Sequence, residues 1–310
     1  MEATELSVLL VGCGNMGQAL LKGCLSLSRP VRVHVVEPAD GLRDKAVELG
    51  ASASAELTVP HQFVPEVILL AVKPHLTAAI LAECREYLAA GAVALSVAAG
   101  VTIATMHGKA GKDGGIIRCM PNTPSQIGAG ALVCCKSSST TDAQVEMASQ
   151  LLSTCGSVHF VEDESLMDAV TAISGSGPAY VFHFIECLAE AGKAAGLPAE
   201  LASELALQTV YGAGKLARES DVGAQELRRR VRLPIRAAHK NVPADVAGRL
   251  TQPVQWPSVA AVKCPRKCVR GNAGRASLII DVAWPWQDLL VVVGFEIFSR
   301  QRDPLGESRV

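Results

Sequence analysis

The chain has 310 residues, of which 49% are apolar and 19% charged, and its formal net charge is −1. This charge gives no electrostatic reason to expect nucleic acid or an anionic membrane as a partner, and no apolar run reaches the ~20 residues of a membrane-spanning helix. The first residues are polar and acidic, unlike a signal peptide, and ten cysteines are scattered largely through apolar segments, as reduced thiols are. We therefore expect a cytoplasmic protein.

The first predicted element is an apolar strand, Val8–Val11, which leads into Gly12-x-Gly14-x-x-Gly17 and then a helical pattern. In dinucleotide-binding folds the first glycine permits a tight turn, the second lets the backbone approach a pyrophosphate, and the third lets helix and strand pack closely. The N–H groups at the helix start then hold the phosphates. The pattern predicts a dinucleotide site; the alternative is a glycine-rich turn without a ligand.

A second predicted strand, "VRVHVVEP", ends at Glu37, twenty residues after Gly17. A carboxylate at this position accepts hydrogen bonds from the adenosine ribose hydroxyls, and it would repel a 2′-phosphate. Glu37 therefore favours NAD over NADP.

Strand and helix patterns continue to alternate along the next hundred residues. Further strands are predicted in "VPEVILLAVKPH", "GAVALSVAAGV", "GGIIRCMPNTP", "GALVCCK" and "SVHFVED". Ligands of an open α/β sheet lie beyond the carboxyl ends of its strands, so small and polar residues there are expected to line a cofactor cleft. Lys73 is either part of a turn fixed by Pro74 or a catalytic group, and Asn122 either orients the cofactor or caps a turn. The fold class is α/β, with a Rossmann-type doubly wound sheet of buried, parallel strands.

The chain becomes helical after this sheet. Apolar residues follow helical spacing on both sides of "ISGSGPAY", and Gly196-Leu197-Pro198 ends one helix and starts another. We predict a dinucleotide-binding domain over 1–162, a helical substrate and dimerisation domain over 163–231, and an atypical, poorly ordered tail over 232–310.

The stretch "ISGSGPAY" allows two interpretations. Ser176 lies between Gly175 and Gly177, which resembles the surroundings of a hydrolase nucleophile. A nucleophile elbow, however, needs a strand before the serine, and here the sequence before it follows a helical pattern. We therefore favour a helix start whose N–H and hydroxyl groups receive a ligand. A hinge that caps a helix is the structural alternative.

Five motifs, "VGCGNMG", "AVKPH", "SVAAG", "RCMPNTP" and "DAVTAISGSGPAY", occur in this order within residues 11–180. Together they resemble the pyrroline-5-carboxylate reductase family, and the resemblance covers about residues 6–231. It implies an oxidoreductase that transfers hydride from NADPH or NADH to 1-pyrroline-5-carboxylate and forms L-proline. It also implies a helical dimerisation domain and a homodimer or higher homo-oligomer.

The resemblance carries site residues over to this chain but names no catalytic proton donor. The family often uses NADPH, whereas Glu37 favours NADH. The expected substrate residues are Glu164, Ser174, Gly175, Ser176 and Gly177. The expected cofactor residues are Gly12, Cys13, Gly14, Asn15, Met16, Gly17, Glu37, Ala71, Val72, Lys73, Pro74, Val97, Ala98, Ala99 and Asn122.

The sequence departs from the family after Val231, where a glycine- and threonine-rich substrate loop and two closing helices are expected. Arginine and proline become frequent there, and all three tryptophans follow residue 250. This change resembles translation in an altered reading frame, which we state as a hypothesis. Because the expected substrate loop is absent, the alternative function is that of a catalytically impaired nucleotide-binding protein. Cys264-x-x-x-Cys268 lacks a second pair of ligands, so no metal site is predicted.

Overall fold

The computed structural model describes residues 5–111, 114–231, 279–280 and 291–292. The chain divides into two compact units, Met1–Pro178 and Ala179–Val310. The sequence places the boundary at residue 162, whereas the units divide inside a helix that begins at Gly177. Each unit is described by itself below.

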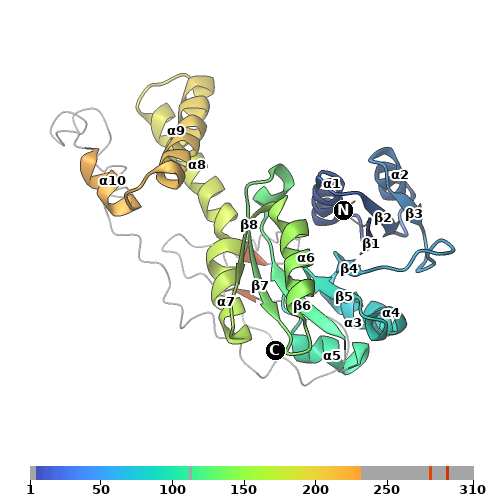
Figure 1. Cartoon of the computed structure of the whole chain (residues 1–310). Helices are drawn as coiled ribbons and strands as arrows, with labels where there is room; N and C mark the ends of the chain where they lie inside the picture. The colour runs from blue at the N-terminus through green and yellow to red at the C-terminus, as the bar shows by residue number, and fades with distance from the viewer. Residues whose placement is uncertain (1–4, 112–113, 232–278, 281–290, 293–310) are drawn as a thin grey trace, which may run out of the picture. The chain divides into compact units, whose positions relative to one another are not determined.

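The first unit is built on one eight-stranded sheet in the order β3-β2-β1-β4-β5-β6-β7-β8 (Figure 1). Its strands are β1 (Leu6–Val11), β2 (Val31–Val36), β3 (Ser52–Ser54), β4 (Val67–Leu70), β5 (Val93–Ser96), β6 (Gly115–Met120), β7 (Gly130–Lys136) and β8 (Gly156–Phe160). The order reverses between β1 and β4, which is where a doubly wound sheet binds its ligand. The predicted Rossmann-type sheet is confirmed.

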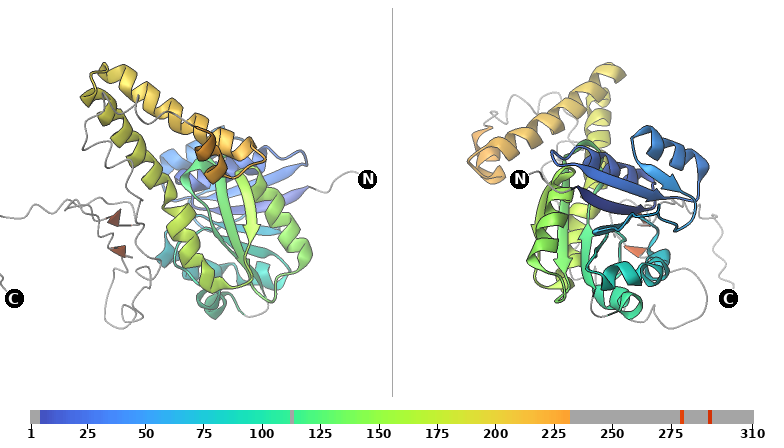
Figure 2. Two further views of the ribbon diagram at one scale, coloured as in Figure 1. Left: turned by 90° about the vertical axis from the view of Figure 1, so that its left-hand side faces the viewer. Right: turned by 45° about the vertical axis from the view of Figure 1, so that its right-hand side comes forward.

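Helices cover both faces of this sheet (Figure 2). They are α1 (Asn15–Leu25), α2 (Asp40–Glu48), α3 (Pro74–Glu83), α4 (Arg85–Ala89), α5 (Ile103–Ala110) and α6 (Asp142–Ser153). Residues of α1, α2 and α6 join one apolar core with the sheet, and residues of α3, α4 and α5 join the other. Because successive side chains of a strand point to opposite faces, Leu10 belongs to the first core and Leu9 to the second.

The strand pairing differs from an all-parallel sheet at one position. β7 runs antiparallel to β6, with Cys119 opposite Cys134, while every other pair in this sheet is parallel. The expectation of parallel strands is therefore corrected here: only the 3₁₀ turn Thr123–Ile127 and four more residues separate β6 from β7, too little for a parallel crossover.

A helical segment closes the first unit and continues beyond it. It begins with a 3₁₀ turn, Glu164–Leu166, followed by α7 (Met167–Val170), a π-helical turn (Thr171–Gly175) and α8 (Gly177–Ala194). The N–H of Ser176 donates to the carbonyl of Thr171 at 2.8 Å, so the chain remains helical through the Ser-Gly sequence. Single π turns inside α-helices occur frequently at functional sites.

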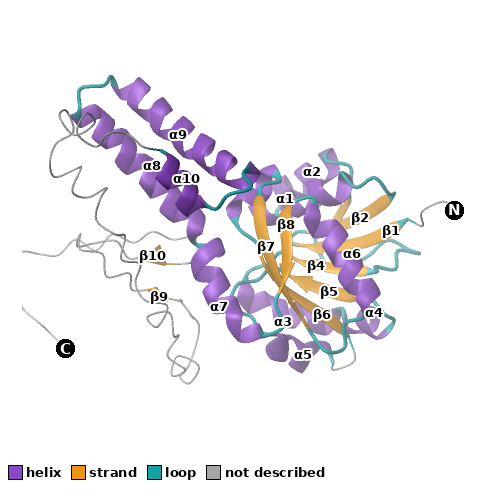
Figure 3. Cartoon of the chain, turned by 60° about the vertical axis from the view of Figure 1, so that its left-hand side comes forward, coloured by secondary structure: helices purple, strands orange, loops and turns teal. Residues whose placement is uncertain are grey.

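The second unit contains the rest of α8 together with α9 (Ala199–Glu219) and α10 (Ala224–Arg230), coloured as helices in Figure 3. Gly196 adopts φ +95°, and the N–H of Leu197 donates to the carbonyl of Gly192, which ends α8 as predicted. Two short strands, β9 (Ile279–Ile280) and β10 (Val291–Val292), pair antiparallel. The other predictions for the tail lie outside the described residues. None of the helices in the described ranges is long and apolar enough to cross a membrane.

Candidate functional site

The glycine-rich turn joins β1 to α1 and lies against the end of β4. Gly12 has φ +92°, and a Cβ atom on it would lie 2.6 Å from the carbonyl oxygen of Ala71. A Cβ atom on Gly17 would lie 2.2 Å from the carbonyl oxygen of Gly12. A Cβ atom on Gly14 would meet no atom within 4 Å. Two of the glycines are therefore required by packing, and the third borders open space.

Glu37 lies against this turn from the end of β2. Its side chain is buried, and Oε2 accepts a hydrogen bond from the N–H of Cys13 at 2.8 Å. Its Oε1 accepts from the N–H of Ala39 at 3.0 Å. Burial raises the pKa of the Cys13 thiol, and the negative charge of Glu37 raises it further. The predicted ribose-binding carboxylate is thus held beside the glycine-rich turn.

The ends of β4 and β5 continue the same edge of the sheet. The N–H of Ala71 donates to the carbonyl of Val11, and the N–H of Val97 donates to that of Leu70. Lys73 is exposed, and it occupies the N-cap position of α3 with Pro74 in the first turn. This geometry supports the turn interpretation of Lys73. The predicted cofactor residues of the first, fourth and fifth strands therefore follow neighbouring strand ends: Gly12–Gly17, Ala71–Pro74 and Val97–Ala99.

Asn122 connects the end of β6 to the Ser-Gly turn. Its Nδ2 donates to the carbonyl of Ser174 at 3.0 Å, and its Oδ1 accepts from the N–H of Ala131 at 2.9 Å. A Cβ atom on Gly175 would lie 2.5 Å from the terminal methyl of Met120. The structure therefore brings Asn122 and the Ser-Gly turn together, and it gives the Asn122 amide a bridging position. A contact of Asn122 with cofactor stays a prediction.

The hydroxyls of the Ser-Gly turn have different environments. Ser174 Oγ donates to the carbonyl of Val170 at 3.0 Å, which occupies it within the helix. Ser176 Oγ is buried and has no hydrogen-bond partner within the described residues. A buried hydroxyl without a partner is unusual, so Ser176 is the serine of this turn whose hydrogen bond is not satisfied within the described residues.

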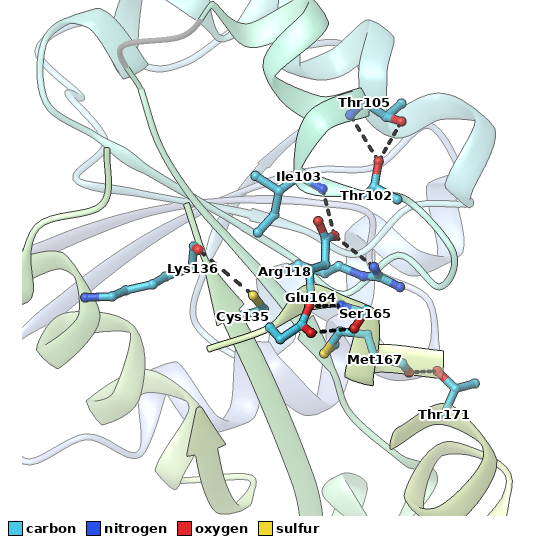
Figure 4. A network of polar contacts seen from close by, with 11 residues as sticks. Thr102, Ile103, Thr105, Arg118, Cys135, Lys136, Glu164, Ser165, Met167 and Thr171 are labelled. Atoms are coloured by element: carbon cyan, nitrogen blue, oxygen red, sulfur yellow. Dashed lines mark hydrogen bonds and ion pairs between the residues drawn. The ribbon is translucent and has the colours of Figure 1, made fainter. Parts of the chain in front are cut away.

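Glu164 forms a polar cluster with β6 and α5 (Figure 4). Its Oε1 accepts from Arg118 Nη1 at 2.8 Å and from the N–H of Ile103, the first residue of α5, at 2.9 Å. The Arg118 side chain is 7% exposed and that of Glu164 is 27% exposed. The predicted substrate-side acid is thus engaged with the protein, and a direct role in substrate binding stays a prediction.

Sequence reasoning assigned no role to Arg118 or Arg43. Arg118 lies inside the apolar strand "GIIRCM". A charged residue at such a position is almost never fully buried without a partner, so the sequence itself indicates that Arg118 has an ion-pair or hydrogen-bond partner. Arg43 Nη1 donates to the carbonyls of Glu37 and Pro38, and its Nη2 pairs with Asp40. No local pattern distinguishes Arg43 from a solvated helix residue.

The residues at this edge fit a dinucleotide. α1 begins after Gly14 with no side chain capping its first turn, and the first N–H groups of a helix have no partner within it. The space beside Gly14 leaves those N–H groups open to a phosphate. The arrangement can hold a pyrophosphate at α1 and a ribose at Glu37.

Two families match this chain. One, described as pyrroline-5-carboxylate reductase dimerisation, matches residues 164–235, and the other, described as NADP oxidoreductase coenzyme F420-dependent, matches residues 7–100.

Individual relatives cover most of the described chain. The pyrroline-5-carboxylate reductase of Pseudomonas aeruginosa is 36% identical over 236 residues, which is 73% of this chain and 84% of the relative. That of Pisum sativum is 34% identical and covers 67% of this chain and 76% of the relative.

Solved structures agree with these relatives. The pyrroline-5-carboxylate reductase of Coxiella burnetii matches with a TM-score of 0.68 and 31% identity, covering 73% of this chain and 85% of that one. A pyrroline carboxylate reductase of Plasmodium falciparum with NADP bound matches with a TM-score of 0.63 and 28% identity, covering 76% of this chain and 86% of that one. With 36% identity to such a reductase over 73% of its length, this chain belongs to the pyrroline-5-carboxylate reductase family.

Proposed function

We propose that this chain reduces 1-pyrroline-5-carboxylate to L-proline with NADH or NADPH as the hydride donor. The observation that carries the proposal is the open space beside Gly14 at the uncapped start of α1, in a chain that belongs to this reductase family. The Ser-Gly turn supports the second half of the proposal, because Asn122 ties it to the carboxyl end of β6.

A bound nicotinamide cofactor supplies the hydride, and the protein supplies binding, orientation and electrostatics. The N–H groups at the start of α1 hold the pyrophosphate, and Glu37 holds the adenosine ribose. Ser176 donates its unpaired hydroxyl to the carboxylate of the substrate. The chain thereby fixes the ring of the substrate relative to the hydride donor, and such orientation is a large part of what an enzyme contributes to a bimolecular step.

Formation of proline tests this proposal. The purified full-length chain is incubated with 1-pyrroline-5-carboxylate and reduced cofactor, and proline is measured by mass spectrometry. We expect proline to accumulate only when both reactants are present. Ser176→Ala is expected to raise the KM for the imine, while Ser203→Ala, whose hydroxyl donates to the carbonyl of Ala199 on α9, serves as a matched control. Absence of proline under all conditions would contradict the proposal.

We further propose that the chain forms a homodimer or a higher homo-oligomer through α8 and α9. Large apolar side chains on these helices are exposed within the single chain, including Phe184, Leu205 and Tyr211 at 47%, 47% and 61%. Large exposed apolar patches in soluble proteins mark interaction sites. The description of the matching family as a dimerisation family supports a second copy as the partner.

Sedimentation velocity tests the oligomer. The wild-type chain is expected to sediment as a dimer or larger species, and Leu205→Asp is expected to shift it toward the monomer. Val47→Asp places the same charge on an exposed apolar residue of α2, outside the proposed interface, so it should leave the distribution unchanged. A monomeric wild-type chain would contradict this proposal.

A cytoplasmic location is also proposed. The cysteines in the described part of the chain are free, and seven of these eight are buried. Compartments that keep thiols reduced suit such a set. Fractionation of cells that express the chain, with detection by antibody, checks the location; recovery in an oxidising compartment would contradict it.

A further inference from the structure

An exposed cysteine and an exposed histidine lie together on α8. The Sγ of Cys187 lies 3.6 Å from Nε2 of His183, which is four residues earlier in the chain. Residues four apart lie on the same face of a helix, so the contact follows from the spacing of the two residues. The other seven free cysteines of the described part of the chain are buried, whereas Cys187 is exposed.

Glu186 orients the imidazole of His183 from the other side of the ring. Its Oε2 lies 3.4 Å from Nδ1 of His183. When an Nδ1–H group donates to this carboxylate, the lone pair of the neutral ring lies on Nε2, the nitrogen that faces Cys187. The side chains of His183 and Glu186 are 56% and 75% exposed, so an ion in solution can reach this nitrogen.

The separation of the sulfur and the nitrogen fits one shared metal ion. Zinc binds thiolate sulfur at about 2.3 Å and imidazole nitrogen at about 2.0 Å, and two such ligand atoms in a tetrahedral site are about 3.5 Å apart. The separation on α8 is 3.6 Å, so the two side chains are spaced for chelation as they stand. Thiolate and imidazole both suit zinc, and a carboxylate on the second ring nitrogen is the usual outer partner of a zinc-binding histidine.

We propose that His183 and Cys187 bind a thiophilic divalent cation such as Zn²⁺, and that Glu186 holds the histidine in its ligating orientation. The ion binds Nε2 and the deprotonated Sγ, and the thiol proton passes to solvent. In the described ranges no group of three or more His, Cys, Asp or Glu side chains is placed to hold a metal ion, so the chain supplies two ligands here and water supplies the others.

The contact between the two side chains carries this inference, since no metal site is predicted from the sequence. The inference does not depend on the proposed function, because His183, Glu186 and Cys187 are not among the proposed cofactor or substrate residues.

Titration with Co²⁺ tests the site, because a thiolate bound to this ion gives a charge-transfer absorption in the near ultraviolet. The full-length chain is reduced and freed of metal with a chelator, which is then removed. We expect the absorption to appear as Co²⁺ is added and to disappear as Zn²⁺ displaces the cobalt. The displacement curve gives the Kd of Zn²⁺.

Variants of the two ligands separate this site from other thiols. Loss even of an outer partner typically lowers metal affinity about 10–100-fold. Cys187→Ser and His183→Gln, which each remove a ligand, should therefore weaken Zn²⁺ binding at least about tenfold. Cys187→His keeps two ligands at the same spacing, so Zn²⁺ should still bind while the thiolate absorption is lost.

Two matched controls change the same residue types elsewhere. His61→Gln replaces another exposed histidine, and Cys264→Ser replaces a cysteine that lies outside the described residues. Both variants should keep the thiolate absorption and the wild-type Kd of Zn²⁺.

Two results would overturn the inference. The first is a wild-type chain that shows no thiolate absorption with Co²⁺, a result that requires no variant. The second is a Kd of Zn²⁺ that Cys187→Ser and His183→Gln leave unchanged, which would place the ion on other side chains. Formation of proline is a separate measurement, so a chain without reductase activity could still bind the metal ion.

Discussion

The glycines of the first turn show how single residues divide between folding and binding. Gly17 has no room for a side chain because the backbone of Gly12 lies against it, whereas Gly14 borders open space in an extended conformation that any residue adopts. The two positions are close in sequence and serve different purposes.

Serine at each position separates these purposes. Gly17→Ser is expected to lower the free energy of unfolding by about 1–3 kcal/mol, since the helix must move away from the strand. Gly14→Ser should change stability by no more than about 0.5 kcal/mol but weaken ADP-ribose binding, because its side chain occupies the proposed phosphate position. Thermal unfolding and calorimetric titration check both variants. Equal losses of stability would contradict the distinction.

His34 predicts a pH dependence of stability. Its ring is buried in β2, with Nδ1 within 2.8 Å of Ser52 Oγ and Nε2 within 3.0 Å of Ser54 Oγ and of the Thr58 carbonyl. Burial lowers the pKa of His34, and the hydrogen bond to Thr58 offsets part of this effect. The unfolded chain therefore binds the proton more readily than the folded chain does.

The contribution of the neutral His34 ring to the free energy of unfolding is fully present above the ordinary histidine pKa of about 6.5. This contribution is lost as the pH falls through the lowered pKa of the folded chain. The urea midpoint of the wild-type chain should therefore decrease between about pH 7.5 and about pH 5.5. In His34→Gln this decrease should be smaller, while in His61→Gln, which changes an exposed histidine, it should remain. An identical decrease in all three chains would rule out His34 as the source.

At the scale of elements, the cluster of Arg118, Glu164 and Ile103 joins parts that are distant in sequence. It ties β6 and the first turn of α5 to the 3₁₀ turn that precedes α7. The same α7 segment continues into the Ser-Gly turn, which Asn122 ties to β6 independently. These side-chain bonds position the Ser-Gly turn relative to the sheet.

Glu164→Ala would leave the buried guanidinium of Arg118 without its ion-pair partner, and it is expected to cost about 1–3 kcal/mol of stability. Glu190→Ala on α8 removes an exposed pair with Lys193 and should cost no more than about 1 kcal/mol. Chemical denaturation of the two variants checks the difference. A loss for Glu164→Ala no larger than that for Glu190→Ala would show that the cluster contributes little.

Local sequence patterns predicted the elements that have strong periodicity. The glycine motif, the apolar strands and the helix end at Gly196 were found because each depends on neighbouring residues. β3 was missed, since Ser52–Ser54 is short and carries no apolar alternation. The π turn and the partners of Asn122, Arg118 and Glu37 depend on contacts between distant segments, which a single sequence does not display.

For the molecule as a whole, the family match and the departure of the sequence end at nearly the same place. The match to the dimerisation family ends at residue 235, and the departure begins after Val231. The cofactor residues proposed here lie between Gly12 and Asn122 and therefore precede the departure. The catalytically impaired nucleotide-binding protein remains the alternative because the expected substrate loop would follow Val231.

Measuring turnover and cofactor-site binding in one preparation tests whether the full-length chain is a working reductase. Oxidation of NADH and NADPH is followed at about 340 nm with 1-pyrroline-5-carboxylate, and ADP-ribose binding is titrated in the same preparation. We predict imine-dependent oxidation of both cofactors, with the higher kcat/KM for NADH. Binding of ADP-ribose without any imine-dependent oxidation would contradict a reductase activity and identify the chain as a nucleotide-binding protein that has lost its reaction.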